Sequence, residues 1–248
     1  MRLGFVALLL AACGAEIVEQ PRVDPKQDPD PQPDPDPDPP PDPDPMPRCS
    51  NGRVVYLNFD GVTLRSTQMN SNAANNAASW SPGTRTLPAY HAASATRAAD
   101  IADITNRVTA ALAEFPVTVV TERPTSGHYV MVVLGGSAVT DLQFDAEYAG
   151  MADLDCGDEA IDDVAWVSDL CPTTAYAANV ALGSIGLGLG LSGTTEPADC
   201  MCGWGTQCAI SQSTTCQFST MVAAQSACDS STSQSETAVI HKAFCEAL

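Results

Sequence analysis

The chain has 248 residues, of which 44% are hydrophobic and 17% charged, and its formal net charge at pH 7 is −19. Only eleven Lys and Arg residues are available to neutralise phosphates, so the composition argues against a nucleic-acid partner. Apolar runs stay well short of the roughly eighteen residues that a membrane-spanning helix needs, whereas the length suffices for one buried core. We therefore expect one soluble folded domain.

The N-terminus predicts export and a lipid anchor. Residues 3–12 form an apolar stretch of signal-peptide length. The Leu-Ala-Ala-Cys sequence that ends at Cys13 resembles the lipobox of bacterial lipoproteins. This resemblance implies that residues 1–12 are a signal peptide and that acyl chains on Cys13 bind a membrane. Gly14 follows the cysteine, which by similarity to enterobacterial sorting implies the outer membrane or cell surface. An ordinary secretory signal is the alternative.

An acidic Asp-Pro segment follows the cysteine. Thirteen of the nineteen prolines lie in residues 21–47, which contain almost nothing apolar to bury. Alternating carboxylates repel one another along an extended polyproline chain, so the segment is predicted to be a disordered spacer that reaches on the order of 80 Å. We assign residues 13–47 to the lipidated cysteine and this linker, and residues 48–248 to the folded domain.

The first predicted elements of the domain are a strand and a long helix. Residues 53–61, RVVYLNFDG, have the β-branched and aromatic composition of a strand closed by Asp-Gly, and a polar loop is expected from there to about residue 87. Residues 92–115 place apolar side chains at spacings of three and four, which predicts an amphipathic helix that ends before Pro116. The apolar face consists of Ile101, Ile104, Val108, Leu112 and Phe115.

Three more strands and a terminal helix complete the pattern. The strands are expected at residues 117–124, 128–136 and 164–167, and the helix at residues 232–248. This order predicts an α/β (α+β) fold, with a mixed twisted sheet, a long backing helix and a disulfide-rich C-terminal part.

Cysteine content supports that last expectation. Nine cysteines follow Cys13: Cys49, Cys156, Cys171, Cys200, Cys202, Cys208, Cys216, Cys228 and Cys245. In an exported protein disulfides are the expected state. Because nine is odd, at most four bridges form, and one thiol stays free or pairs with another chain. The spacing of Cys200 and Cys202 lacks the histidine or second cysteine pair of a zinc site.

Several of these segments together resemble metzincin-type zinc metallopeptidases. VVYLNFDG resembles the first strand of that family, the helix and paired strands follow in the family's order, and Met201 stands in the place of its Met-turn. The resemblance implies that residues 173–194 correspond to the active-site helix, which in the family carries H-E-x-x-H-x-x-G-x-x-H and holds zinc.

The chemical positions of that motif do not match. With Gly190 aligned to the motif glycine, the three zinc ligands fall on Gly183, Leu187 and Gly193, and the general base falls on Ser184. Glycine and leucine offer no lone pair to zinc, and serine does not replace a carboxylate base. We therefore predict that the zinc expected of the family is not held and that the domain is catalytically inactive. Each glycine also weakens a helix by about 1 kcal/mol, so we expect this one to be frayed or remodelled.

Other catalytic patterns are incomplete. His91, His128 and His241 lie on different predicted elements without the i, i+4 spacing of zinc ligands, so we expect them at the surface. Ser137 and Ser192 each stand in a partial G-x-S-x-G elbow, and residues 188–193 satisfy G-x-G-x-x-G without a preceding strand.

Acidic residues 153–163 give one further metal hypothesis. Asp153, Asp155, Asp158 and Asp162 are closely spaced carboxylates, as hard cations such as calcium prefer, although a solvated loop is the simpler interpretation. Three functions stay open: an inactive metallopeptidase-like lipoprotein that binds a protein or peptide, an active metal-dependent peptidase with a non-standard site, and a structural or adhesive envelope module stabilised by calcium.

Overall fold

The computed structural model describes residues 52–246, which belong to one unit of the chain, Met46–Leu248. The predicted signal peptide, the predicted lipidation site Cys13, the predicted Asp-Pro linker and Cys49 lie outside the described residues. None of the helices formed by residues 52–246 combines the length and apolar character needed to cross a bilayer.

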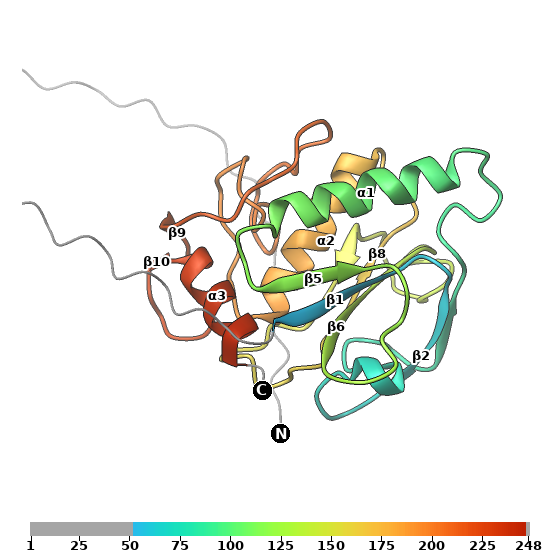
Figure 1. Cartoon of the computed structure of the whole chain (residues 1–248), viewed down its shortest axis with the longest axis horizontal. Coiled ribbons are helices and arrows are strands. Elements are labelled where there is room, and N and C mark those ends of the chain that lie inside the picture. Colours follow the sequence, from blue (N-terminus) through green and yellow to red (C-terminus); the bar gives the residue numbers. More distant parts are fainter. Residues whose placement is uncertain (1–51, 247–248) are drawn as a thin grey trace, which may run out of the picture. The chain divides into compact units, whose positions relative to one another are not determined.

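A five-stranded sheet forms the centre of the domain (Figure 1). Its strands run in the order β5-β1-β6-β8-β7, and β7 is antiparallel to β8 whereas the other pairs are parallel. The bounds are β5 (Val117–Val120), β1 (Arg53–Asn58), β6 (Tyr129–Leu134), β8 (Val164–Val167) and β7 (Gly150–Met151). The predicted mixed α/β architecture is therefore confirmed.

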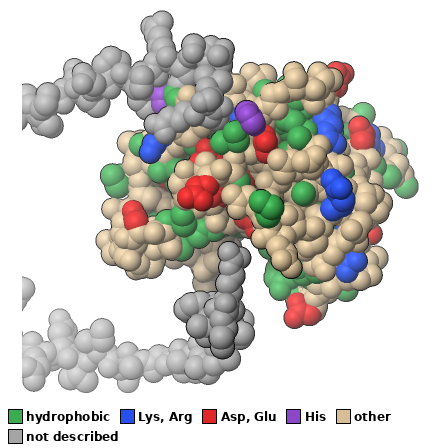
Figure 2. All heavy atoms as spheres, turned by 90° about the horizontal axis from the view of Figure 1, so that it is seen from below, with side chains coloured by type: hydrophobic (Ala, Val, Ile, Leu, Met, Phe, Trp, Pro, Cys, Tyr) green, Lys and Arg blue, Asp and Glu red, His purple; other side chains and the backbone are tan. Residues whose placement is uncertain are grey.

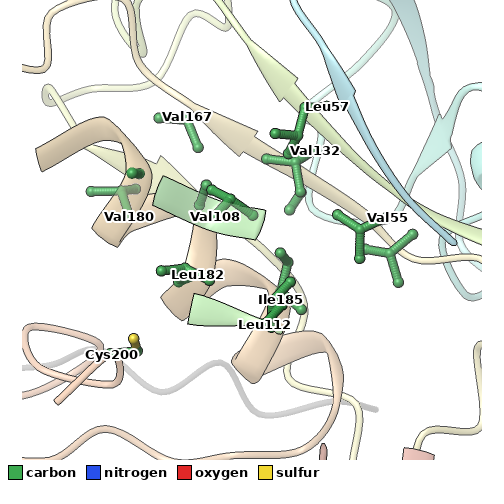
Figure 3. Close-up of a cluster of buried hydrophobic side chains, with 14 of the residues drawn as sticks. Val55, Leu57, Val108, Leu112, Val132, Val167, Val180, Leu182, Ile185 and Cys200 are labelled. Atoms are coloured by element: carbon green, nitrogen blue, oxygen red, sulfur yellow. The ribbon is translucent and has the colours of Figure 1, made fainter. Parts of the chain in front are cut away.

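Both faces of the sheet are covered by other elements, and the side chains of each strand alternate between these two faces. One face packs against helices α1 (Arg97–Ala111) and α2 (Thr174–Gly188), which lie on the same side of the sheet in Figure 1. Figure 3 shows side chains of both helices gathered against those of β1, β6 and β8. The opposite face, which includes Met131 and Trp166, packs against residues from the segment between β1 and α1. Because both of its faces are covered, β6 is buried along its whole length and its sequence is almost entirely hydrophobic.

The segment between β1 and α1 is structured, so the predicted polar loop to residue 87 is wrong. It contains β2 (Val62–Ser66), a short 3-10 helix η1 (Ala73–Asn75), β3 (Ala77–Ala78) and β4 (Arg85–Leu87). The strands form a separate sheet in the order β3-β2-β4. Each of these strands buries a single side chain, Leu64, Ala78 or Leu87, so the hydrophobic pattern is too short to be detected along the sequence.

Helix α1 lies within the predicted range of 92–115 but is shorter. The expected apolar residues face the core, since Ile104, Val108, Leu112 and Phe115 are buried and Ile101 is partly buried, but Leu112 and Phe115 follow the helix, which ends at Ala111. Residues before Arg97 form turns, and His91 has a φ of 45°. The helix therefore begins later than the apolar pattern alone indicates.

Helix α2 is regular over fifteen residues, so the expectation that its glycines would fray it is wrong. It begins at Thr173, whose hydroxyl accepts a hydrogen bond from Tyr176 N at 3.1 Å. Twelve of its residues are buried, so tertiary packing outweighs their low helix propensity. The helix ends at Gly188, and the chain turns away at Gly190, with φ of 88°, where Leu191 N donates to Gly186 O at 2.9 Å and Gly190 N donates to Leu187 O at 3.0 Å.

The C-terminal part is stapled by disulfides, as predicted. It contains β9 (Val222–Ala223), β10 (Ser233–Gln234) and helix α3 (Glu236–Glu246). The pairs within the described residues are Cys156–Cys228, Cys200–Cys216 and Cys202–Cys208, and Cys245 is also disulfide-bonded. Cys171 is the free thiol of this part of the chain, and burial raises its pKa to about 12. The unpaired cysteine is thus hidden in the core.

Candidate functional site

Two of the three positions aligned with zinc ligands lie against Trp204. A Cβ added to Gly183 would overlap the Trp204 indole and come within 2.5 Å of the Cys200 carbonyl oxygen, and a Cβ added to Gly193 would overlap the Trp204 carbonyl oxygen. Cys200 and Cys202 are both held in disulfides, which fix the segment that carries Trp204. The space that two ligand side chains would need is therefore filled by this tryptophan and its backbone.

The third position, Leu187, lines a cleft of about 690 Å³ next to the same tryptophan. The cleft is bounded by α2, by the segment around Gly193 and by β9. None of the described residues that line it is charged, and their polar side-chain groups are hydroxyls, one amide and the indole N–H of Trp204. Its apolar lining consists of Leu154, Leu187, Trp204, Ala223, Ala224 and Ala227. Such a surface suits an uncharged ligand.

The remaining motif positions have structural contacts. Ser184, which is aligned with the general base, is buried and donates its hydroxyl to Ala181 O at 2.8 Å, so it is unavailable for proton transfer in the cleft. Met201 is fully buried below α2, and a Cβ on Gly186 would lie 2.5 Å from its Sδ. The predicted Met-turn-like residue therefore packs beneath the helix at one of its glycines.

The three histidines do not meet at a metal site. His91 is half-buried between Asp100, at 3.0 Å from Nδ1, and Asp169, at 3.6 Å from Nε2, and its ring stacks on Tyr90. His128 is exposed and pairs with Asp162 at 3.1 Å. The prediction that all three histidines lie at the surface is therefore confirmed for His128, whereas His91 and His241 are partly buried.

The two candidate serine nucleophiles also have local roles. Ser137 Oγ accepts a hydrogen bond from Thr140 N at 3.0 Å, and Ser192 Oγ accepts one from Ala227 N at 3.1 Å. Gly188, the first glycine of G-x-G-x-x-G, ends a helix instead of following a strand. Neither arrangement builds a serine hydrolase triad or a dinucleotide fingerprint.

Asp199 and Glu236 form a buried carboxylate pair that joins the segment of Met201 to α3. Ser219 connects the two acids, since its hydroxyl donates to Asp199 Oδ2 at 2.6 Å and its N–H donates to Glu236 Oε2 at 2.8 Å. Burial and the neighbouring Asp199 raise the pKa of Glu236. The two acids lie far apart in the sequence and share no motif, so no local signal marks the pair.

A second acidic cluster lies at the C-terminal end of α2. Carboxylate oxygens of Asp155, Asp158 and Asp163 lie within 4.8 Å of one another. The buried Arg53 guanidinium donates to both oxygens of Asp158, at 2.8 and 2.9 Å. Burial raises the pKa of Asp163 to about 8, the Arg53 charge opposes that rise, and the Asp155 charge adds to it. The cluster thus brings three carboxyl groups together beside one guanidinium.

Only two of the four predicted calcium candidates belong to this cluster. Asp153 accepts hydrogen bonds from the hydroxyls of Ser71, at 2.7 Å, and Ser79. Asp162 accepts one from Tyr129 N at 3.1 Å and pairs with His128. Asp153 and Asp162 therefore contact other elements, and Asp163 is the third acid of the cluster.

On the face shown in Figure 2, Lys and Arg side chains are scattered and do not form a continuous basic patch.

A scan against protein-family models found no matching family, and a search of curated proteins found no matching sequence.

Proposed function

We propose that the chain is a lipid-anchored protein of the bacterial cell envelope whose metallopeptidase-like domain is catalytically inactive and binds a polypeptide. The observation that carries this proposal is the placement of Trp204 against Gly183 and Gly193. Two of the three positions that would hold zinc in a metzincin thus lack both a ligand atom and the room for one. Without zinc, no bound water is activated for attack on a peptide bond.

The chemistry of the cleft favours an uncharged segment of polypeptide as the ligand. Trp204, Leu187 and Leu154 offer apolar surface, and the hydroxyl of the exposed Thr195 offers a hydrogen bond beside it. Charged side chains would lose hydration there without gaining a partner of opposite charge. A neutral, apolar peptide loses the least hydration free energy on binding and buries the most apolar surface.

An active peptidase with a non-standard site receives less support. Among residues 52–246, the three side chains of metal-ligand type that lie close enough to share an ion are Asp155, Asp158 and Asp163, and none of them lines the cleft. Ser184 is buried with its hydroxyl bonded to the helix backbone. The geometry therefore supports binding in the cleft over hydrolysis.

Binding can be tested with the full chain and an immobilised library of random decapeptides. We expect retention of peptides rich in neutral apolar residues and poor retention of charged ones. Ala223→Arg places a charge at the exposed edge of the cleft and should reduce retention at least roughly tenfold, which is about 1.4 kcal/mol. Ala93→Arg, an exposed residue outside the cleft, is the matched control and should leave retention unchanged. Equal effects of the two substitutions, or no selectivity for neutral peptides, would contradict the proposal.

A further inference from the structure

We propose that Asp155, Asp158 and Asp163 form a calcium site. These three residues lie outside the set that lines the peptide cleft, so the site stands independently of the proposed binding function. It would stabilise the domain where the end of α2 meets the loop that precedes β8.

The three acids of this cluster face one another with Arg53 on one side only. Their carboxylate oxygens converge within 4.8 Å, and the Arg53 guanidinium donates to both oxygens of Asp158. The last turn of α2 adds the negative end of its helix dipole, since Leu187 O accepts the N–H of Asp155 at 3.3 Å. A divalent cation held between the three carboxylates would offset their mutual repulsion and this dipole.

The state of Asp163 is a second and separate indication of a ligand. Its residue exposure is only 5%, and no hydrogen-bond donor among the described residues reaches its Oδ2. Buried polar oxygens are nearly always paired, and leaving a carboxylate oxygen without a partner is costly. A bound cation would supply the missing partner for Oδ2.

Two glycines lie close against these acids. A Cβ on Gly188 would lie 2.9 Å from Asp163 Oδ2, and a Cβ on Gly190 would lie 2.9 Å from the Asp155 carbonyl oxygen, so a side chain at either position would crowd these oxygens. Glycine thus keeps side-chain atoms away from a carboxylate oxygen and a carbonyl oxygen of the cluster. Both kinds of oxygen are normal calcium ligands.

Calcium fits this donor set better than zinc. All the candidate ligands are oxygens, whereas zinc sites in proteins use mainly nitrogen and sulfur. Donor atoms that lie within 4.8 Å of one another also fall inside the span of about 5.2 Å that separates two ligands on opposite sides of Ca²⁺.

The test uses the full chain purified in detergent, treated with EDTA and titrated with CaCl₂ by calorimetry, with Tm measured in parallel. We expect a saturable site of about one Ca²⁺ per chain and a rise in Tm of roughly 5 °C at saturating calcium. Asp163→Asn should abolish both responses. The control Asp145→Asn, at an exposed acid outside the cluster, should keep both. All variants keep the Asp-Pro segment, so calcium binding by the carboxylates of that segment would persist in Asp163→Asn, whereas binding at the proposed site would be lost.

A second variant keeps the test decisive if Asp163→Asn does not fold. Asp155→Asn retains an oxygen that can accept the hydrogen bond from Ala160 N, now 2.6 Å from Asp155 Oδ2, and should also abolish the response. The proposal is overturned if wild type shows no response at millimolar calcium, if both variants respond like wild type, or if NaCl at equal ionic strength gives the same rise in Tm. A response to MgCl₂ as strong as that to CaCl₂ overturns the choice of calcium.

Discussion

The indole of Trp204 lies directly against Gly183, and the space beside the helix at this point is too small for even one additional methyl group. The contact joins a glycine of α2 to a segment held by the Cys200–Cys216 and Cys202–Cys208 disulfides. Glycine is therefore needed at position 183 for close packing, which accounts for a residue that is otherwise unfavourable in a helix.

Gly183→Ala should lower the free energy of unfolding by about 1–3 kcal/mol, because its Cβ overpacks the contact with Trp204 and Cys200 O. Urea unfolding measures the loss. The same substitution in a Trp204→Ala background should cost less, since part of the overlap is removed. Gly83→Ala is the control, because its Cβ would meet only the Arg85 side chain at ordinary contact distances, and its effect should be within about 0.5 kcal/mol. Equal costs for Gly183→Ala in both backgrounds would refute the contact.

The disulfides should contribute unequally to stability. Cys156–Cys228 spans 72 residues, whereas Cys202–Cys208 spans six. Loop-closure entropy predicts that replacing both cysteines by Ser costs about 4 kcal/mol for the first bridge and about 2 kcal/mol for the second. Denaturant unfolding of the two double variants gives the comparison. If the short bridge proves the more important, the constraint on the unfolded chain is not the main source of the stabilisation.

Glu236 should make the domain less stable as pH rises. Its pKa is raised above the ordinary value of 4.5 by burial and by Asp199. Below pH 4.5 both the folded and the unfolded chain hold this proton, so its contribution to stability is fully present there. Above that pH the unfolded chain releases the proton first, and the contribution is lost progressively until the pH passes the raised pKa of the folded state.

Glu236→Gln should therefore flatten the fall in stability between about pH 5 and about pH 8, where one retained proton is worth up to about 1.4 kcal/mol per pH unit. Urea unfolding across this range measures the slope. The exposed Glu122→Gln is the matched control and should leave the slope of wild type intact. A Glu236→Gln slope equal to that of wild type would show that Glu236 ionises normally in the folded protein.

Cys13→Ala should release the protein from membranes, because Cys13 is the residue expected to carry the acyl chains. Fractionation of cells that make each form, followed by immunoblotting, measures the distribution. We expect the wild-type chain in the membrane fraction and the variant outside it. Variant protein that sediments with membranes as wild type does would rule out anchoring through Cys13.

The sequence predicted the elements that carry long hydrophobic signals. Residues 128–136 and 164–167 were expected as strands and form β6 and β8, because strands covered on both faces are apolar throughout. The segment 62–87 was missed, because β2, β3 and β4 are short and each buries few residues. Helix propensity gave the wrong expectation for α2. Glycine has a low helix propensity, but the close contacts of Gly186 with Met201 and of Gly183 with Trp204 require glycine at these positions.

The site was predictable in part. Motif alignment identified Gly183, Leu187 and Gly193, and the structure places all three beside Trp204. The alignment gave no reason to single out Trp204 itself, because its role depends on how the disulfide-bonded segment folds back. The partnership of Asp163 with Asp155 and Asp158 likewise depends on β8 and α2 meeting in space, which spacing along the chain does not encode.

The most direct test of the central claim is the zinc content and peptidase activity of the full chain. The protein is equilibrated with ZnCl₂, dialysed, analysed for bound metal and assayed on a broad mixture of denatured proteins. We predict well below one zinc per chain and no cleavage above a chelator-treated sample, because Trp204 fills the space beside Gly183 and Gly193. One zinc per chain together with cleavage that chelators abolish would contradict the account.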